Sequence, residues 1–261
     1  MHHEAPLLGR FRVPMPALNL LLTLLGLMFL GEVVLDRTLN AWNATRGYAG
    51  EDISFATLYA LGADSPAFLV EGEVWRTFTA VFLHAGLIHF LMNGFALWQL
   101  GRAVQSLFGG TLLLASFLFT GLIASLVSDG WFCLQGQPGL SVGASGAVCG
   151  LMGLLIAHFR RRTDIVALQL RRQLITWAIV NLVLGIIIPN VNNAAHAGGF
   201  AAGFLLDHCL EGRARLVTAQ RARVATLILF VTALAAIAWG IAFVAERSED
   251  VRIGLGALEG R

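Results

Sequence analysis

Apolar stretches of about membrane-spanning length recur along this chain and constrain its fold more than any other feature. A helix needs roughly 20 mostly apolar residues to cross the hydrocarbon core of a bilayer. The composition agrees, because 57% of the residues are hydrophobic and only 13% are charged, about half the charge of an ordinary soluble domain. We count seven stretches, of which the fourth and sixth are short: 16–35, 81–101, 110–128, 144–159, 172–189, 196–211 and 224–245.

These stretches predict an all-α membrane protein, a polytopic helical bundle with no room for a separate soluble domain other than the stretch 36–80. The first stretch follows Arg10 and Arg12. Its apolar core is long for a signal peptide and no small-residue cleavage motif follows, so we expect an uncleaved helix. With the N-terminus inside, twelve of the 18 basic residues, all arginines, fall on the inner side. The positive-inside rule therefore predicts a cytoplasmic N-terminus and an extracytoplasmic C-terminus.

Two loops are long enough to have structure of their own. Residues 36–80 are expected outside, and their tryptophan and tyrosine residues fit either a loop that dips into the membrane interface or a structured cap. Residues 129–143 contain four glycines and a proline, which argue against a helix there.

Neither the cysteines nor the basic residues indicate a bound group. Cys133, Cys149 and Cys209 are scattered without metal-ligand spacing or a disulfide pattern. We therefore expect no metal and no cofactor. No basic stretch carries the aromatic side chains that stack on bases, so the charge balance does not indicate nucleic-acid binding.

Polar residues gather near the beginnings of the second, fourth and sixth stretches, which all run from outside to inside. Topology alone therefore places them in one layer near the outer face. Ser145 lies fifteen residues before Arg160, or about 22 Å along a helix, which puts it several ångströms below the outer surface of a core about 30 Å thick. The residues of this layer are His84, His89, Asn93, Ser145, Asn192, Asn193 and His196.

Four of these polar residues have both a structural and a catalytic interpretation. Ser145 is either an N-cap or a nucleophile whose oxyanion the free N–H groups of the first helical turn would stabilise. His89 and Asn93 share a helix face, where they either hold two helices together or complete an oxyanion hole. His196 is either a structural histidine at a helix start or the base of Ser145.

No acid is placed to complete a catalytic triad. Asp207, the nearest acid along the sixth stretch, lies eleven residues after His196, roughly 16 Å along the helix axis. The residues therefore predict a Ser–His dyad, with Asn193 or a backbone carbonyl orienting the imidazole.

Four motifs on four different elements resemble those of the rhomboid intramembrane serine proteases. They are WR at 75–76, HAGLIHFLMN at 84–93, GASGAVCGLMG at 143–153 and NNAAHAGGFAAG at 192–203, and the resemblance extends over about 75–210. It implies a cytoplasmic tail at 1–15, a six-helix rhomboid-like core at 16–211 with the outer loop 36–80, and a segment 212–261. That last segment would hold a cytoplasmic loop, a seventh transmembrane helix and an extracytoplasmic tail.

The resemblance also implies roles for individual residues. Ser145 matches the nucleophile and His196 the general base, while His89, Asn93 and the Ser145 backbone N–H match the oxyanion hole. The supporting positions implied by the family are Gly143, Gly146, Gly199, Gly203, His84, Trp75 and Arg76.

Two positions depart from the pattern of the family. Cys149 stands where some members carry an aromatic residue that stacks on the catalytic histidine, which affects how firmly the imidazole is held. Gln105 stands where many members have an acid. Because glutamine can still form hydrogen bonds, we expect this second departure to affect stability rather than activity.

The function implied is a serine endopeptidase that cleaves peptide bonds in or near the transmembrane helices of membrane-protein substrates, located in a bacterial inner membrane. The alternative is a catalytically weak or inactive rhomboid-like adaptor or chaperone, although such relatives typically lack the serine or the histidine. A small transporter is a third interpretation. It would require polar residues in both halves of the membrane and internal symmetry, neither of which this sequence has.

Overall fold

The computed structural model describes residues 15–42, 53–136, 139–188, 191–211 and 231, and its regular elements there are all helical. The predicted seventh stretch apart from residue 231, the C-terminal tail and the N-terminal tail before residue 15 lie outside the described residues. The elements are α1 (Pro16–Trp42), α2 (Phe55–Leu61), α3 (Pro66–Val70), α4 (Arg76–Thr79), the 3-10 helix η2 (Ala80–Phe82), α5 (Leu87–Phe108), α6 (Gly110–Gln135), α7 (Ser145–Phe159), α8 (Ile165–Ile187) and α9 (Asn193–Glu211).

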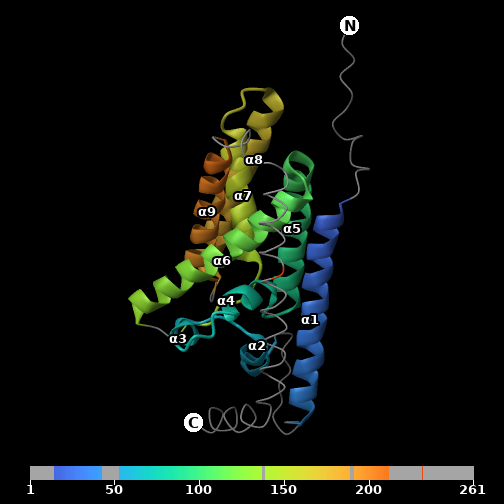
Figure 1. Cartoon of the computed structure of the whole chain (residues 1–261), viewed down its shortest axis with the longest axis vertical. Coiled ribbons are helices and arrows are strands. Elements are labelled where there is room, and N and C mark those ends of the chain that lie inside the picture. Colours follow the sequence, from blue (N-terminus) through green and yellow to red (C-terminus); the bar gives the residue numbers. More distant parts are fainter. Residues whose placement is uncertain (1–14, 43–52, 137–138, 189–190, 212–230, 232–261) are drawn as a thin grey trace.

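Six long helices overlap the first six predicted apolar stretches. Among the described residues, three segments are long and apolar enough to cross a bilayer by length and composition alone, and they lie in α1, α6 and α8. The α7 helix is apolar but shorter, with 15 residues. Figure 1 shows α7 beside α9 and α6 crossing the bundle. The helices α5 and α1 lie on the side of the bundle opposite α9 (Figure 1).

The second predicted stretch is wrong at its start. Residues 76–82 form the short helices α4 and η2, and α5 begins only at Leu87. Leu83, which lies between η2 and α5, has an extended backbone. His84 therefore precedes α5 instead of lying within it.

The prediction of a non-helical segment at 129–143 is wrong for its first half, because α6 continues to Gln135. A glycine within a helix costs only about 1 kcal/mol relative to alanine, so Gly130 does not end the helix. The helix ends at Gly136, whose φ of 63° is the left-handed conformation that favours glycine.

The α7 helix lies at the centre of the bundle, and all of its residues except Ser145 and His158 are buried. Its closest neighbour is α9. A Cβ at Gly199 would overlap the carbonyl of Gly146, and a Cβ at Gly203 would overlap the carbonyl of Gly150. Small residues four apart let helix backbones approach this closely, which brings side chains at the two helix starts within reach of each other.

Candidate active site

Ser145 and His196 meet at the N-terminal ends of the two central helices, α7 and α9. Ser145 is the first residue of α7, and His196 lies in the first turn of α9. His196 Nε2 lies 2.8 Å from Ser145 Oγ although the two residues are 51 positions apart in the sequence. Hydrogen bonds between a hydroxyl and an imidazole nitrogen have this length. With the proton of the neutral ring on Nδ1, Nε2 has the lone pair that accepts the serine proton.

The second ring nitrogen of His196 is less well held. Nδ1 is buried and has no hydrogen-bond partner among the described residues. Asn193, proposed above to orient the ring, does not bond to it, because its amide oxygen lies against Gly185 of α8 and is itself without a partner there. Asp207 is also remote from the ring, since its carboxylate pairs with Arg161 at 2.7 Å.

Free backbone N–H groups surround the start of α7. The first intrahelical bond of α7 runs from the Val148 N–H to the Ala144 carbonyl at 2.9 Å. The N–H groups of the preceding residues, Ser145 included, therefore have no partner within the helix. They add to the positive end of the helix dipole, which favours negative charge at this position.

Two side-chain donors from α5 flank Gly143, two residues before Ser145. A Cβ at Gly143 would lie 2.8 Å from His89 Nε2 and 3.8 Å from Asn93 Nδ2. Gly143 also has a φ of 117°, a conformation that L side chains rarely adopt. A side chain here would be strained and would occupy the space between the α5 donors and the serine.

The hydrogen bonds of His89 and Asn93 determine which groups can still donate. The Ala85 N–H donates to His89 Nδ1 at 3.4 Å, so a neutral ring carries its proton on Nε2, the nitrogen near Gly143. Asn93 Nδ2 donates one hydrogen to the His89 carbonyl at 3.0 Å and retains a second. Both nitrogens can therefore donate toward the start of α7.

His84 stabilises the segment that precedes α5. Its backbone N–H donates to both carboxylate oxygens of Glu32, at 3.1 Å each. Its ring makes edge contacts with His89 and Phe90. Sequence reasoning missed Glu32, which is fully buried. An acid within the apolar stretch 16–35 was the available signal.

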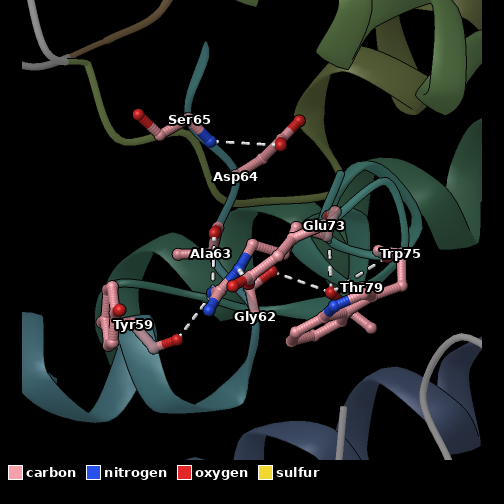
Figure 2. A network of polar contacts seen from close by, with 9 residues as sticks. Tyr59, Gly62, Ala63, Asp64, Ser65, Glu73, Trp75 and Thr79 are labelled. Carbon is pink, nitrogen blue, oxygen red and sulfur yellow. Dashed lines mark hydrogen bonds and ion pairs between the residues drawn. The ribbon is translucent and has the colours of Figure 1, made fainter. Parts of the chain in front are cut away.

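Trp75 and Arg76 organise the segment 59–79 rather than the dyad. The Arg76 guanidinium pairs with Glu73 and donates to the carbonyls of Tyr59 and Ala63. It also lies over the rings of Tyr59, Phe68 and Trp75. Thr79 Oγ1 donates to the Gly62 carbonyl at 2.8 Å. Figure 2 shows Tyr59, Gly62, Ala63, Glu73, Trp75 and Thr79 gathered in this network.

The segment 59–79 is connected directly to the segment before Ser145. Asp64 and Ser141 exchange two backbone hydrogen bonds, of 3.0 and 2.8 Å. The Asp64 side chain is also buried, and one of its oxygens accepts the Ser65 N–H at 3.1 Å (Figure 2). Burial raises the pKa of Asp64 to about 7, and the nearby charge of Asp129 adds to that effect. Sequence reasoning did not single out Asp64.

The two departures from the family pattern also have defined surroundings. Cys149 is buried one turn after Ser145 and carries no ring to place against His196. Gln105 is buried in α5, and its side-chain oxygen accepts the Leu18 N–H in the first turn of α1 at 2.9 Å. Gln105 thus satisfies one of the free N–H groups at that helix start.

The arrangement as a whole suits nucleophilic attack on a carbonyl. It combines a hydroxyl bonded to an imidazole with several hydrogen-bond donors near the same atom, the combination that acyl transfer requires. The described part of the chain contains no group of three or more His, Cys, Asp or Glu side chains able to hold a metal ion.

Comparison with known proteins identifies the same region. The model of the rhomboid domain family matches residues 71–213. The chain is 33% identical over 155 residues to Rhomboid protease GluP of Bacillus subtilis, which covers 59% of this chain and 30% of that protein. It is 38% identical over 156 residues to RHOMBOID-like protein 1 of Arabidopsis thaliana, covering 59% of this chain and 39% of the relative. The chain thus spans less than half the length of these relatives.

Proposed function

Because this chain belongs to the rhomboid family and is therefore a multi-pass helical membrane protein, we propose that it is an intramembrane serine protease acting through a Ser145–His196 dyad. One observation carries the proposal: the 2.8 Å distance between Ser145 Oγ and His196 Nε2 in the first turns of two closely packed helices. The substrates would be other membrane proteins, cleaved in or near a transmembrane helix.

The first chemical step follows from that hydrogen bond. His196 Nε2 takes the proton of the Ser145 hydroxyl while Oγ attacks the carbonyl carbon of the scissile peptide bond. A neutral imidazole is required, because a protonated ring has no lone pair to accept the proton. The carbonyl oxygen then bears the negative charge of a tetrahedral intermediate.

Three donors are available to stabilise that charge. They are the Ser145 backbone N–H at the start of α7, His89 Nε2–H and the remaining hydrogen of Asn93 Nδ2. The loss of one such donor typically reduces kcat by about 10²- to 10³-fold. The positive end of the α7 dipole acts in the same direction.

The intermediate then collapses toward an acyl-enzyme. The imidazolium of His196 gives its proton to the leaving nitrogen, and the peptide bond breaks. Water attacks the resulting ester with His196 again acting as base, which releases the second product and restores Ser145. Ser145 is half-buried, in keeping with a site that must admit water from one side only.

We extend the proposal to topology. The inner end of α7 is followed by Arg160, Arg161 and Arg162, while the dyad lies at the opposite end of that helix. This supports a cytoplasmic N-terminus and a site facing the outer half of the membrane. The bacterial inner-membrane location is proposed on a different ground, the use of arginine for all 18 basic residues. The six-helix core 16–211, with its tail 1–15 and a seventh helix in 212–261, remains part of the same proposal.

The test compares cleavage of a single-span membrane substrate by purified wild type, Ser145→Ala and His196→Ala in detergent micelles. We expect cleavage only by wild type, and labelling of wild type but not Ser145→Ala by a fluorophosphonate that reacts with activated serines. Thermal unfolding should show that both variants remain folded.

Equal cleavage by all three proteins would refute the dyad. A folded wild-type protein that neither cleaves the substrate nor reacts with the fluorophosphonate would favour the alternative, a catalytically inactive adaptor or chaperone.

A further inference from the structure

The position of the His196 imidazole depends on the backbone that carries it. Its Nδ1 has no hydrogen-bond partner among the described residues, so Ser145 Oγ is the one polar contact that the ring makes there. A ring without an acid behind it is oriented by the first turn of its own helix. Whatever fixes the start of α9 therefore fixes the dyad.

Asn192 holds the start of α9 in two ways. Its side-chain oxygen accepts the Ala195 N–H at 3.0 Å, the bond of an N-cap. Its Nδ2 donates to the hydroxyl of Ser128, a fully buried residue of α6. The first bond fixes the local conformation of the helix end, and the second attaches that end to a different helix.

The same amide also reaches the segment that carries the nucleophile. Asn192 Nδ2 lies 3.4 Å from Ser141 Oγ. Ser141 is four residues before Ser145, and Asn192 is four residues before His196. One side chain therefore connects the backbone leading to the serine with the backbone leading to the histidine, and Ser141 is itself paired with Asp64 of the outer loop.

We propose that Asn192 is a positioning residue of the dyad, which holds the start of α9 against α6 and against the Ser141 segment so that His196 meets Ser145. The inference rests on the proposed protease function. The Asn192 side chain bonds to Ser128, Ser141 and the Ala195 N–H rather than to the reacting atoms of the dyad, and it acts through the residues it holds.

The effect on catalysis follows from geometry. A misplacement of about 1 Å between reacting groups can reduce the rate of a reaction by about 100-fold. Removing the Asn192 amide releases one end of the helix that positions the base, while the close glycine packing further along α7 and α9 remains. The loss should therefore appear in the chemical step more than in folding.

The experiment measures kcat, KM and thermal unfolding of the full chain in micelles, with a single-span substrate, for Asn192→Ala, Ser128→Ala and the double variant. We expect Asn192→Ala to lose about 10- to 100-fold in kcat with KM changed less than about 2-fold. The rate of fluorophosphonate labelling of Ser145 should fall by a similar factor, and the double variant should be no slower than Asn192→Ala alone.

Two further variants separate positioning from general packing. Asn192→Asp keeps one oxygen that can cap α9 and has another that can accept a hydrogen bond from the Ser128 hydroxyl. Its kcat should therefore lie within about 5-fold of wild type, above that of Asn192→Ala. Ser116→Ala is the matched control. Ser116 is equally buried on α6, about 18 Å along the axis from Ser128, and its hydroxyl bonds only to carbonyls of its own helix among the contacts described. It should leave kcat unchanged.

The outcomes distinguish this inference from the proposed function. A wild-type protein that cleaves, together with an Asn192→Ala variant of equal kcat and labelling rate, overturns the inference and leaves the protease in place. A wild type that neither cleaves nor is labelled overturns both. If Asn192→Ala does not fold, Ser128→Ala decides, and a wild-type kcat in that variant overturns the inference.

Discussion

Replacing Asp64 with asparagine should stabilise the folded protein, and the gain should appear only as the pH rises above about 4. Burial and the charge of Asp129 raise the pKa of Asp64 to about 7, against the opposing attraction of Arg76. The folded protein therefore retains a proton that an unfolded chain releases near pH 4. Stability contributed by this group is complete below about pH 4 and is lost as the pH rises to about 7.

The magnitude follows from the same pKa. The pKa of Asp64 lies roughly 3 units above the ordinary value for an aspartate, and each pKa unit corresponds to about 1.4 kcal/mol of stability. Ionised Asp64 thus costs the folded state up to roughly 4 kcal/mol at pH 8 relative to an exposed carboxylate. An asparagine at this position would be neutral at every pH and could still accept the Ser65 N–H.

Thermal or denaturant-induced unfolding in micelles, followed from pH 4 to 8, measures this difference. The advantage of Asp64→Asn should grow from less than about 1 kcal/mol near pH 4 to several kcal/mol at pH 8. Asp129→Asn is the companion variant: removing that charge lowers the pKa of Asp64, so Asp64→Asn should gain less in that background. An advantage of the same size at both ends of the pH range would refute the reasoning.

Three other substitutions test contacts around the dyad. Gly203→Ala should push a Cβ into an α7 carbonyl and cost about 1–3 kcal/mol of stability together with activity, whereas Gly94→Ala, which meets open space, should cost neither; equal losses would contradict this packing. Glu32→Ala should lower the free energy of unfolding by about 1–3 kcal/mol, because the His84 N–H loses its acceptor. Glu32→Gln keeps an acceptor and should therefore keep most of the wild-type stability in thermal unfolding. Gln105→Leu should lower the unfolding temperature by removing the acceptor at the start of α1, yet leave kcat unchanged at temperatures where the protein is folded; a fall in kcat would show a role in the site.

The apolar stretches were enough to predict the helices and the layer of polar residues. Six long helices overlap the first six stretches because apolar length is a direct physical requirement for crossing a bilayer. The spacing of four between His89 and Asn93 placed them on one helix face. Topology placed Ser145 and His196 at the same level, where the structure has them in contact.

Helix boundaries were less predictable. Composition suggested a loop after residue 128, but the packing of α6 in the bundle outweighs the modest penalty of Gly130. Conversely, the apolar run from residue 81 looked like a continuous helix, although Leu83 is extended and α5 starts at Leu87. Local propensity does not determine where tertiary contacts end a helix.

The long-range polar contacts were not predictable at all. Glu32 meets His84 across 52 residues, and Asn192 meets Ser128 across 64. A single sequence identifies such residues as polar within apolar surroundings, but not which buried donor finds which acceptor. The prediction that Asn193 orients the imidazole is wrong, because its amide oxygen lies against Gly185 and His196 Nδ1 has no partner among the described residues.

The enclosure of α7 has a consequence for how this protein responds to its membrane. A helix of 15 residues is about 22 Å long, too short to match the roughly 30 Å core of a bilayer, yet it has no side facing lipid. Hydrophobic mismatch acts on surfaces in contact with lipid, and here those belong to outer helices such as α8, which is mostly exposed. A thicker or thinner bilayer would therefore tilt the peripheral helices first, while the depth of Ser145 relative to its protein surroundings stays fixed.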